Sequence, residues 1–411
     1  MENPFSYDHF VGFDWARDHH HVVVVDRQGC VLQQLRFEHS IDGWKAFDEL
    51  VARYPSSAIA IETSSGVVVE QLFQRQLAVY PVQPRAAKSY RERKAPSGVK
   101  DDLLDAWALA DALRVDGQQW RRLRPDDPVV LELRLLCRDQ VVLIEQQTSL
   151  INQLRQALVE YHPALLDAFD DWGSPVAWKF LTEFPTPAKL AKTKDKVRRT
   201  ILKELGCCRP DTIAQRLAAL ARPHLVVSDA VVAAKSLFAL SLAHQWLALE
   251  SQLKVYRQRI ADLFEKHPDH ELFGSLPGAG EKLAPRLLAE LGDEERDVTI
   301  VQAYAGTAPI SFQSGQIHKV RFRQACNKHL RAAVHLWADL SRLRCAWANV
   351  YYQQKRREGK SHACALRCLG QRWLKILCKM RSTHARYEEA LHTQNQLRHG
   401  SWVFQLLPAK G

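Results

Sequence analysis

Acidic residues stand at three separate places where secondary-structure elements are expected to begin or end. Asp14 closes the segment VGFD, Glu62 closes AIAIE, and Asp102 and Asp105 lie in KDDLLDAWALADAL. Residues three apart share one helix face, so Asp102 and Asp105 would point the same way. If folding gathers the four carboxylates, their hard oxygens suit one or two Mg²⁺ ions. Two such ions would promote phosphoryl transfer.

Two neighbouring features leave alternatives open. Asp101 and Asp105 are four residues apart and could also share a helix face, whereas an acidic residue at a helix start is often only a cap. Asp18 and the run His19-His20-His21 stand at a strand start. Alternation along a strand would send those histidines to opposite faces, which favours a solvated hairpin over a metal site.

The first 115 residues alternate expected strands and helices. Three closely spaced β-rich runs, at 9–14, 20–26 and 31–38, predict an antiparallel meander. They are followed by a helix at 41–54, a buried strand at 58–63, a helix from about Val67, a strand at 78–83 and the helix near Asp101. This order predicts a ribonuclease-H-like α/β fold, in which the ends of the first and fourth strands are neighbours. Asp14 and Glu62 would then meet.

The segment RPDDP, residues 124–128, breaks this pattern, and long helices are expected after it. Regularly spaced apolar residues on two helices predict an antiparallel coiled-coil hairpin or a dimer interface. The first stripe is Leu136, Leu143, Leu150, Leu154 and Tyr161; the second is Leu242, Trp246, Leu249, Leu253, Tyr256, Ile260 and Leu263. A helical insertion is expected between them, at about 165–235. The sequence thus predicts domains at 1–125, 126–268 and 269–411.

The C-terminal region is basic and contains a glycine turn. From residue 301 onward it has 19 Lys and Arg against four Asp and Glu, an excess of 15 that exceeds the +11 of the whole chain. Such asymmetry favours a polyanionic partner over a merely solvated basic surface. In SLPGAGEKLAPRLLAELG, Gly278 and Gly280 would let a phosphate approach the backbone of a helix-hairpin-helix turn. The alternative is a tight turn between core helices.

Composition narrows the class of protein. The 411 residues are 46% hydrophobic and 25% charged, as in soluble globular proteins. With no run of 18 apolar residues and no signal-peptide pattern, neither membrane insertion nor secretion is expected, and we predict a cytoplasmic protein. The nine cysteines form no CxxC pair, which predicts reduced thiols rather than a zinc site.

Six ordered segments resemble one known family. VGFDWARDHHHVVVVDRQG, AIAIETSSG, KDDLLDAWALADAL, LPGAGEKLAPRLLAELG, AYAGTAP and NKHLRAAV occur in the order found in the DEDD-type transposases of bacterial insertion sequences. This is the IS110 group, which also includes the pilin-gene invertases. The resemblance spans roughly residues 8–165 and 235–385. It implies a RuvC-like N-terminal domain, a coiled coil and a C-terminal transposase domain.

The resemblance also implies site residues and partners. The acidic tetrad of the family falls on Asp14, Glu62, Asp102 and Asp105, which leaves Asp101 as a helix cap. The serine of a short Ser-Gly motif, which bonds covalently to DNA in the family, falls on Ser314 in FQSGQ. Family members are guided by a structured RNA that pairs with donor and target DNA. The residues expected to bind nucleic acid are Gly278, Gly280, Lys319, Arg321, Arg323, Lys328 and Arg331.

The resulting hypothesis is an RNA-guided DNA recombinase that excises and inserts its own mobile element. It would use Mg²⁺, with Mn²⁺ as a substitute, and would bind duplex DNA at the element ends and target. A dimer or tetramer at the bacterial nucleoid is expected, because its serine and tetrad lie in different domains. The rivals are a RuvC-like junction-resolving nuclease that uses water, an actin-like sugar kinase, and an inert RNA-binding scaffold. The kinase would need glycine-rich phosphate loops, which DWARDHHH does not supply.

Overall fold

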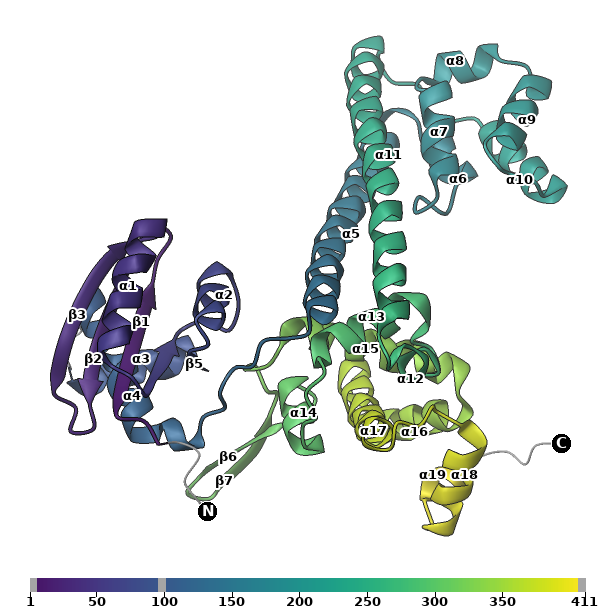
Figure 1. The fold of residues 1–411 in the computed structure, drawn as a ribbon. Helices are drawn as coiled ribbons and strands as arrows, with labels where there is room; N and C mark the ends of the chain where they lie inside the picture. Colours follow the sequence, from purple (N-terminus) through teal and green to yellow (C-terminus); the bar gives the residue numbers. More distant parts are fainter. Residues whose placement is uncertain (1–5, 95–100, 406–411) are drawn as a thin grey trace. The chain divides into compact units, whose positions relative to one another are not determined.

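The computed structural model describes residues 6–94 and 101–405 (Figure 1). Chain contacts divide the protein into two compact units, one up to Pro125 and the other from Asp126 onward. The first is a mixed sheet with helices, and the second is mostly helical.

The first unit contains a five-stranded sheet with strand order β3-β2-β1-β4-β5. Its strands are β1 (His9–Trp15), β2 (His19–Asp26), β3 (Val31–Glu38), β4 (Ser57–Ile61) and β5 (Ala78–Pro81). The meander β1-β2-β3 is antiparallel, and β4 and β5 add to β1 in parallel. This topology is compatible with the expected ribonuclease-H-like fold.

The two faces of this sheet carry separate hydrophobic cores. One face packs against α1 (Ile41–Arg53) and α2 (Val67–Gln74) through residues such as Phe13, Trp44 and Phe47. The other packs against α4 (Asp102–Asp116) through residues such as Phe10 and Leu109, and α3 (Pro84–Lys94) contributes Ala87. A short 3₁₀ turn, Gly117–Gln119, follows α4. No sequence pattern predicted α3.

Gly12 brings α4 onto β1 with no space between them. A Cβ atom at this position would lie 1.7 Å from the Ala106 carbonyl oxygen and 2.6 Å from the Ala110 backbone nitrogen. Backbone atoms of a helix cannot rotate away as a side chain can. The absence of a side chain at Gly12 therefore fixes how closely the helix that carries Asp102 and Asp105 approaches the strand that carries Asp14.

Two long helices, α5 (Pro128–Tyr161) and α11 (Asp229–Lys266), pair in the second unit (Figure 1). Their direction is fixed by three polar contacts: Glu132 with Arg259, Gln147 with Glu250, and Glu160 with Lys235. The residue numbers of the partners increase along α5 as they decrease along α11, so the two helices are antiparallel. Of the predicted stripes, Leu154, Tyr161, Leu242, Trp246, Leu253, Ile260 and Leu263 are buried and the rest are half-buried.

A hydrophobic core stands at each end of this helical hairpin. At one end, five short helices fill the predicted insertion and pack on α5 and α11, with Trp178 stacked on Trp246. They are α6 (Ala164–Ala168), α7 (Pro175–Glu183), α8 (Pro187–Lys192), α9 (Asp195–Glu204) and α10 (Pro210–Leu220). By length and composition α11 could cross a membrane, but a single such helix is weak evidence, and α11 pairs with α5 through ion pairs at Glu132 and Glu160.

The core at the other end joins the hairpin to the C-terminal helices. These are α12 (His270–Gly274), α13 (Gly280–Leu291), α14 (Val298–Tyr304), α15 (Lys328–Arg344), α16 (Ala346–Arg357), α17 (His362–Thr383), α18 (Glu389–Arg398) and α19 (Trp402–Gln405). Between α14 and α15, the strands β6 (Ile310–Ser314) and β7 (Ile317–Arg321) form an antiparallel ribbon. No sequence pattern predicted this ribbon.

We predict that replacing Gly12 with Ala destabilises the first unit by about 3 kcal/mol or more, because the new methyl group meets backbone atoms of α4. Differential scanning calorimetry of the full chain would show the loss. Gly274→Ala is the matched control, since its Cβ would meet no atom within 4 Å, and it should change stability by less than about 0.5 kcal/mol. Equal effects of the two replacements would contradict the assigned packing.

A second prediction concerns Glu290, a buried carboxylate that accepts hydrogen bonds from Arg138 on α5 and Asn327 before α15. Burial alone would raise the pKa of Glu290, but these hydrogen bonds lower it below its ordinary 4.5. The stabilisation is therefore complete above about pH 4.5 and is lost as the pH falls through the lower folded-state pKa. In acid titrations followed by circular dichroism, Glu290→Gln should reduce this pH dependence; an unchanged profile would exclude Glu290 as its source.

Candidate functional site

Strand register places Asp14 and Glu62 side by side at one edge of the sheet. Phe13 and Ile61 are the last partners in the parallel pairing of β1 with β4. Asp14 and Glu62 are the next residues after these partners, so they are neighbours just past the end of this pairing. Side chains alternate along a strand, and Phe13 and Ile61 lie in the core on the α1 side. Asp14 and Glu62 therefore belong to the opposite face, which α4 covers.

The two aspartates of α4 reach the same place from the helix. Ala106 and Leu109 pack on the sheet. Asp102 and Asp105 each lie four positions before one of them, so the aspartates lie on the same face of the helix. Asp101 is the N-cap of α4, and its side chain accepts a hydrogen bond from the Leu103 backbone amide. The capping role expected for Asp101 is confirmed. The start of α4 thus brings Asp102 and Asp105 to the face of the sheet to which Asp14 and Glu62 belong.

Two cationic or titratable side chains border the carboxylates. The Arg91 guanidinium on α3 donates a 2.6 Å hydrogen bond to Asp105, whose side chain is 14% exposed. That hydrogen bond, together with the charge of Asp105 and of Glu62, raises the pKa of Arg91. His21, the register partner of Asp14 on β2, has its Nδ1 3.6 Å from the Asp102 carboxylate. These contacts connect the acids from α4 with those from the strands.

The histidine run behaves differently from the solvated hairpin expected for it. Alternation does separate the three rings, but His20 is fully buried on the α1 side, against Phe13, Phe37 and Trp44. Its Nε2 lies 2.8 Å from Nδ1 of His39. Burial, with nearby histidines adding to it, lowers the pKa of His20 to about 4. The solvated interpretation is wrong for His20, because its aromatic neighbours complete a core.

His19 and His21 lie on the carboxylate side. One ligand atom from each, with one from Asp102, all fall within 4.8 Å of one another. The donor set at this edge therefore combines carboxylate oxygens, which suit Mg²⁺ and Mn²⁺, with two imidazole nitrogens, which suit softer ions such as Zn²⁺, Ni²⁺ or Co²⁺. The residues fit a divalent cation. Asp102 belongs both to the group with the two histidines and to the expected group of four carboxylates.

Ser314 belongs to the second unit, at the tip of the β6–β7 ribbon. It is the last residue of β6 and pairs with Ile317, so the turn between them has two residues, Gly315 and Gln316. Gly315 has a φ of 54°, and such a positive angle at the first turn position is the reason for glycine after the serine. Every residue of both strands is exposed, which leaves the Ser314 hydroxyl accessible.

Cations line the ribbon and the start of α15. Lys319 and Arg321 lie on β7, with the Arg321 guanidinium 4.3 Å from the ring centre of Phe312, and Arg323 donates to the Ala308 carbonyl. Lys328 and Arg331 occupy the first turn of α15 and line a cavity of about 500 Å³. The Phe322 ring in this cavity contacts two guanidiniums. The Cζ atoms of Arg331 and Arg367 lie 5.1 and 4.6 Å from the ring centre.

Gly278 and Gly280 have different surroundings. Both have positive φ angles, but a Cβ on Gly278 would lie 2.7 Å from the Ser341 backbone nitrogen on α15. The close approach at Gly278 is therefore to another helix of the same chain, as in the alternative of a tight turn between core helices. Gly280 begins α13, and its Cβ would meet no atom within 4 Å. The helix-hairpin-helix interpretation is not confirmed.

The carboxylate region and the region around Ser314 each contain residues that no sequence pattern indicated. Arg91 lies on a helix that was not predicted, and Phe322 and Arg367 are separated by 45 positions with no shared motif. His21 stood in a noticed run, but only the register with Asp14 shows that it borders the acids.

Comparisons with known proteins match the region of the carboxylates and, separately, the region of Ser314. The DEDD transposase model of the IS110 group matches residues 11–163, a range that includes all four carboxylates. A second model, described as "Transposase IS116/IS110/IS902 family", matches residues 270–353, which include Ser314 and the basic residues around it. The class of protein is therefore a transposase.

Relatives extend the match over nearly the whole chain. The "Mini-circle putative transposase for IS117" of Streptomyces coelicolor is 35% identical over 405 residues, which cover 92% of this chain and 95% of that protein. The "Insertion element IS116 uncharacterized 44.8 kDa protein" of Streptomyces clavuligerus is 30% identical over 377 residues, which cover 90% and 94%. The chain belongs to the IS116/IS110/IS902 family of insertion-sequence transposases.

We predict that the paired replacement His19→Gln and His21→Gln weakens Co²⁺ binding by roughly tenfold or more while leaving Mg²⁺ binding unchanged, because only the softer ion gains from imidazole nitrogen. The visible absorption of Co²⁺ reports the first ion, and calorimetric titration reports the second. His318→Gln, on the exposed ribbon of the other unit, is the control. An unchanged Co²⁺ spectrum in the paired variant would mean that the carboxylates bind this ion alone.

Proposed function

We propose that this transposase excises and inserts its own insertion sequence by metal-dependent strand exchange, with Ser314 as the nucleophile. The observation that supports the proposal is that Asp14 and Glu62 follow paired residues of β1 and β4, while Asp102 and Asp105 begin the helix that packs on that face, in a chain whose family is transposases. Four acidic side chains at one place suit a divalent cation bound to a DNA phosphate. Bound Mg²⁺ would polarise that phosphate and stabilise the oxygen that leaves it.

The covalent step keeps the number of phosphoester bonds constant. The Ser314 Oγ attacks a phosphorus atom of the DNA backbone, and the bond from phosphorus to one deoxyribose oxygen breaks as the bond to serine forms. The serine proton passes to a base or to solvent, and the departing oxygen takes up a proton. Attack by a hydroxyl of another strand then releases the serine, so no external energy source is needed.

The surroundings of Ser314 support this role. Its exposure at a ribbon tip lets a DNA backbone reach the hydroxyl, and Lys319 and Arg321 on the paired strand provide positive charge for phosphates. A two-stranded ribbon that is exposed on both faces is only marginally stable by itself. The apolar side chains on this one, such as Phe312 and Val320, would gain stability from a bound partner.

The partners proposed are duplex DNA and a structured guide RNA. The resemblance to the IS110 group suggests RNA guidance, and the positive charge concentrated after residue 301 supports a polyanionic partner. Because the carboxylates and Ser314 belong to separate units, we place the complete reaction in a homo-oligomer in which protomers can share sites. Sequencing RNA that co-purifies with the protein tests this partner: a segment from the element's flank should be enriched, with complementarity to donor and target.

We predict that Ser314→Ala abolishes covalent protein–DNA adducts on plasmids that carry element ends, whereas Ser311→Ala on the same exposed strand retains them. Denaturing gels of reactions with labelled DNA would detect the adduct. Chelation of divalent metal, or Asp105→Asn, should remove both adduct and strand cleavage, with a loss of at least about 1,000-fold.

The same assay separates the rival reaction. A junction-resolving nuclease that uses water would continue to cut in the Ser314→Ala variant and would never form an adduct. Continued cutting in that variant would therefore contradict serine catalysis while leaving a metal role for the tetrad.

A further inference from the structure

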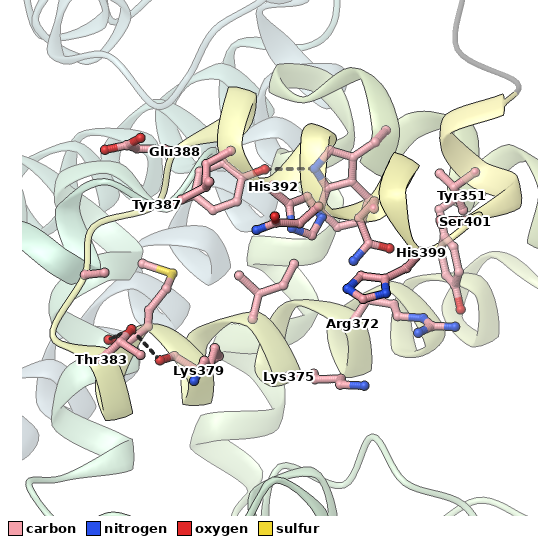
Figure 2. Close-up of a pocket in the computed structure, with 18 of the residues that line it drawn as sticks. Tyr351, Arg372, Lys375, Lys379, Thr383, Tyr387, Glu388, His392, His399 and Ser401 are labelled. Carbon is pink, nitrogen blue, oxygen red and sulfur yellow. Dashed lines mark hydrogen bonds between the residues drawn. The ribbon is translucent and has the colours of Figure 1, made fainter.

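A cavity of about 730 Å³ opens among the last helices of the chain, away from Ser314 in the sequence (Figure 2). We call it the α16–α19 pocket, since its lining comes from α16, α17, α18, α19 and the segment between α17 and α18. Small-molecule sites have volumes of about 300–1,000 Å³. This cavity therefore has room for a nucleotide, but not for a DNA duplex.

Aromatic rings form one side of the α16–α19 pocket. Tyr351 and Trp402 are stacked, with ring centres 5.9 Å apart and planes 25° apart. Tyr387 accepts a 2.9 Å hydrogen bond from the Trp347 indole, and the His392 ring lies against both. Trp402 is 38% exposed, so it offers open ring surface to an incoming flat group.

Cations form another side. Arg372, Lys375 and Lys379 follow one another at three- and four-residue steps on α17, and all three line the pocket (Figure 2). Like charges at this spacing repel one another. Arg386 also lines it but is paired with Glu271, and Glu388 is the one carboxylate among the described lining residues. The row on α17 therefore favours an anionic ligand.

We propose that the α16–α19 pocket binds an unpaired nucleotide of a polynucleotide, with its base against the aromatic side and its phosphates along α17. Unpaired bases stack on aromatic side chains, whereas bases within a duplex are stacked on each other and would have to be extruded. The amides of Asn395 and Gln396 on α18 add donors and acceptors that suit a base edge. Inorganic phosphate would use the cations but not the rings.

This inference rests on the proposed function, because it takes the C-terminal helices to bind nucleic acid. It adds something separate: recognition of a single unpaired nucleotide, in contrast to general attraction to a duplex backbone. An RNA loop and a single DNA strand exposed during exchange offer the same base and phosphate chemistry.

The test uses the full chain and ten-nucleotide single strands that carry one 2-aminopurine, a fluorescent base quenched by stacking. RNA and DNA versions distinguish the two sources. The wild type should quench the probe. Trp402→Ala should weaken binding about tenfold and remove most quenching, because base–aromatic stacking contributes about that factor. Trp402→Phe should restore both, which separates lost stacking from a disturbed helix end.

Charge variants test the phosphate side. Lys375→Gln should reduce the dependence of log affinity on log salt concentration by about 0.7, the value for one contact to a single strand. Arg357→Gln is the matched control, an exposed cation on α16 outside the pocket lining. Equal quenching and affinity in the wild type and Trp402→Ala would overturn the inference, as would a salt dependence unchanged by Lys375→Gln.

Binding to duplex DNA separates this inference from the proposed function. A wild-type chain that binds duplex DNA but does not quench either probe contradicts only the pocket. Failure to bind any polynucleotide contradicts both.

Discussion

The contact between Gly12 and the backbone of α4 is the constraint on which the acidic site depends. Two of the carboxylates come from strand ends and two from a helix more than 85 positions away from Asp14 in the chain. Only a direct approach of the helix to β1 would let these groups bind one cation, as we propose. A methyl group at residue 12 would push α4 outward, and the ligand distances would grow with it. Under this proposal, metal binding at the strand ends depends on the close packing of α4 against Gly12.

Charge balance follows from that packing. Four acidic side chains close together repel one another, and the structure offsets part of this repulsion with Arg91, which donates to Asp105. His21 lies beside Asp102 from the other direction, since β2 pairs with β1 at the level of Asp14. A bound cation would supply the rest of the compensation.

The sequence predicted the parts of this fold that periodicity controls. The five strands follow from alternation, and the two long helices follow from apolar spacing, which left open whether they pair with each other or form a dimer interface. The cap at Asp101 was separated from Asp102 only by the family resemblance. The sequence failed where structure comes from distant contacts. The ribbon around Ser314 has exposed residues on both faces and no inward apolar pattern, and Gly278 is needed only because α15 passes over it. His20 is buried by Trp44 and Phe37, which no local pattern connects to it.

We propose that Asp14, Glu62, Asp102 and Asp105 hold the same metal centre. Anomalous diffraction from crystals grown with Mn²⁺ measures this directly, because the ion reports its own position. We expect peaks at the sheet edge with oxygen ligands from β1, β4 and α4 at about 2.0–2.3 Å. Mn²⁺ bound only by His19, His21 and Asp102, with Asp14 and Glu62 left outside its coordination sphere, would contradict the claim.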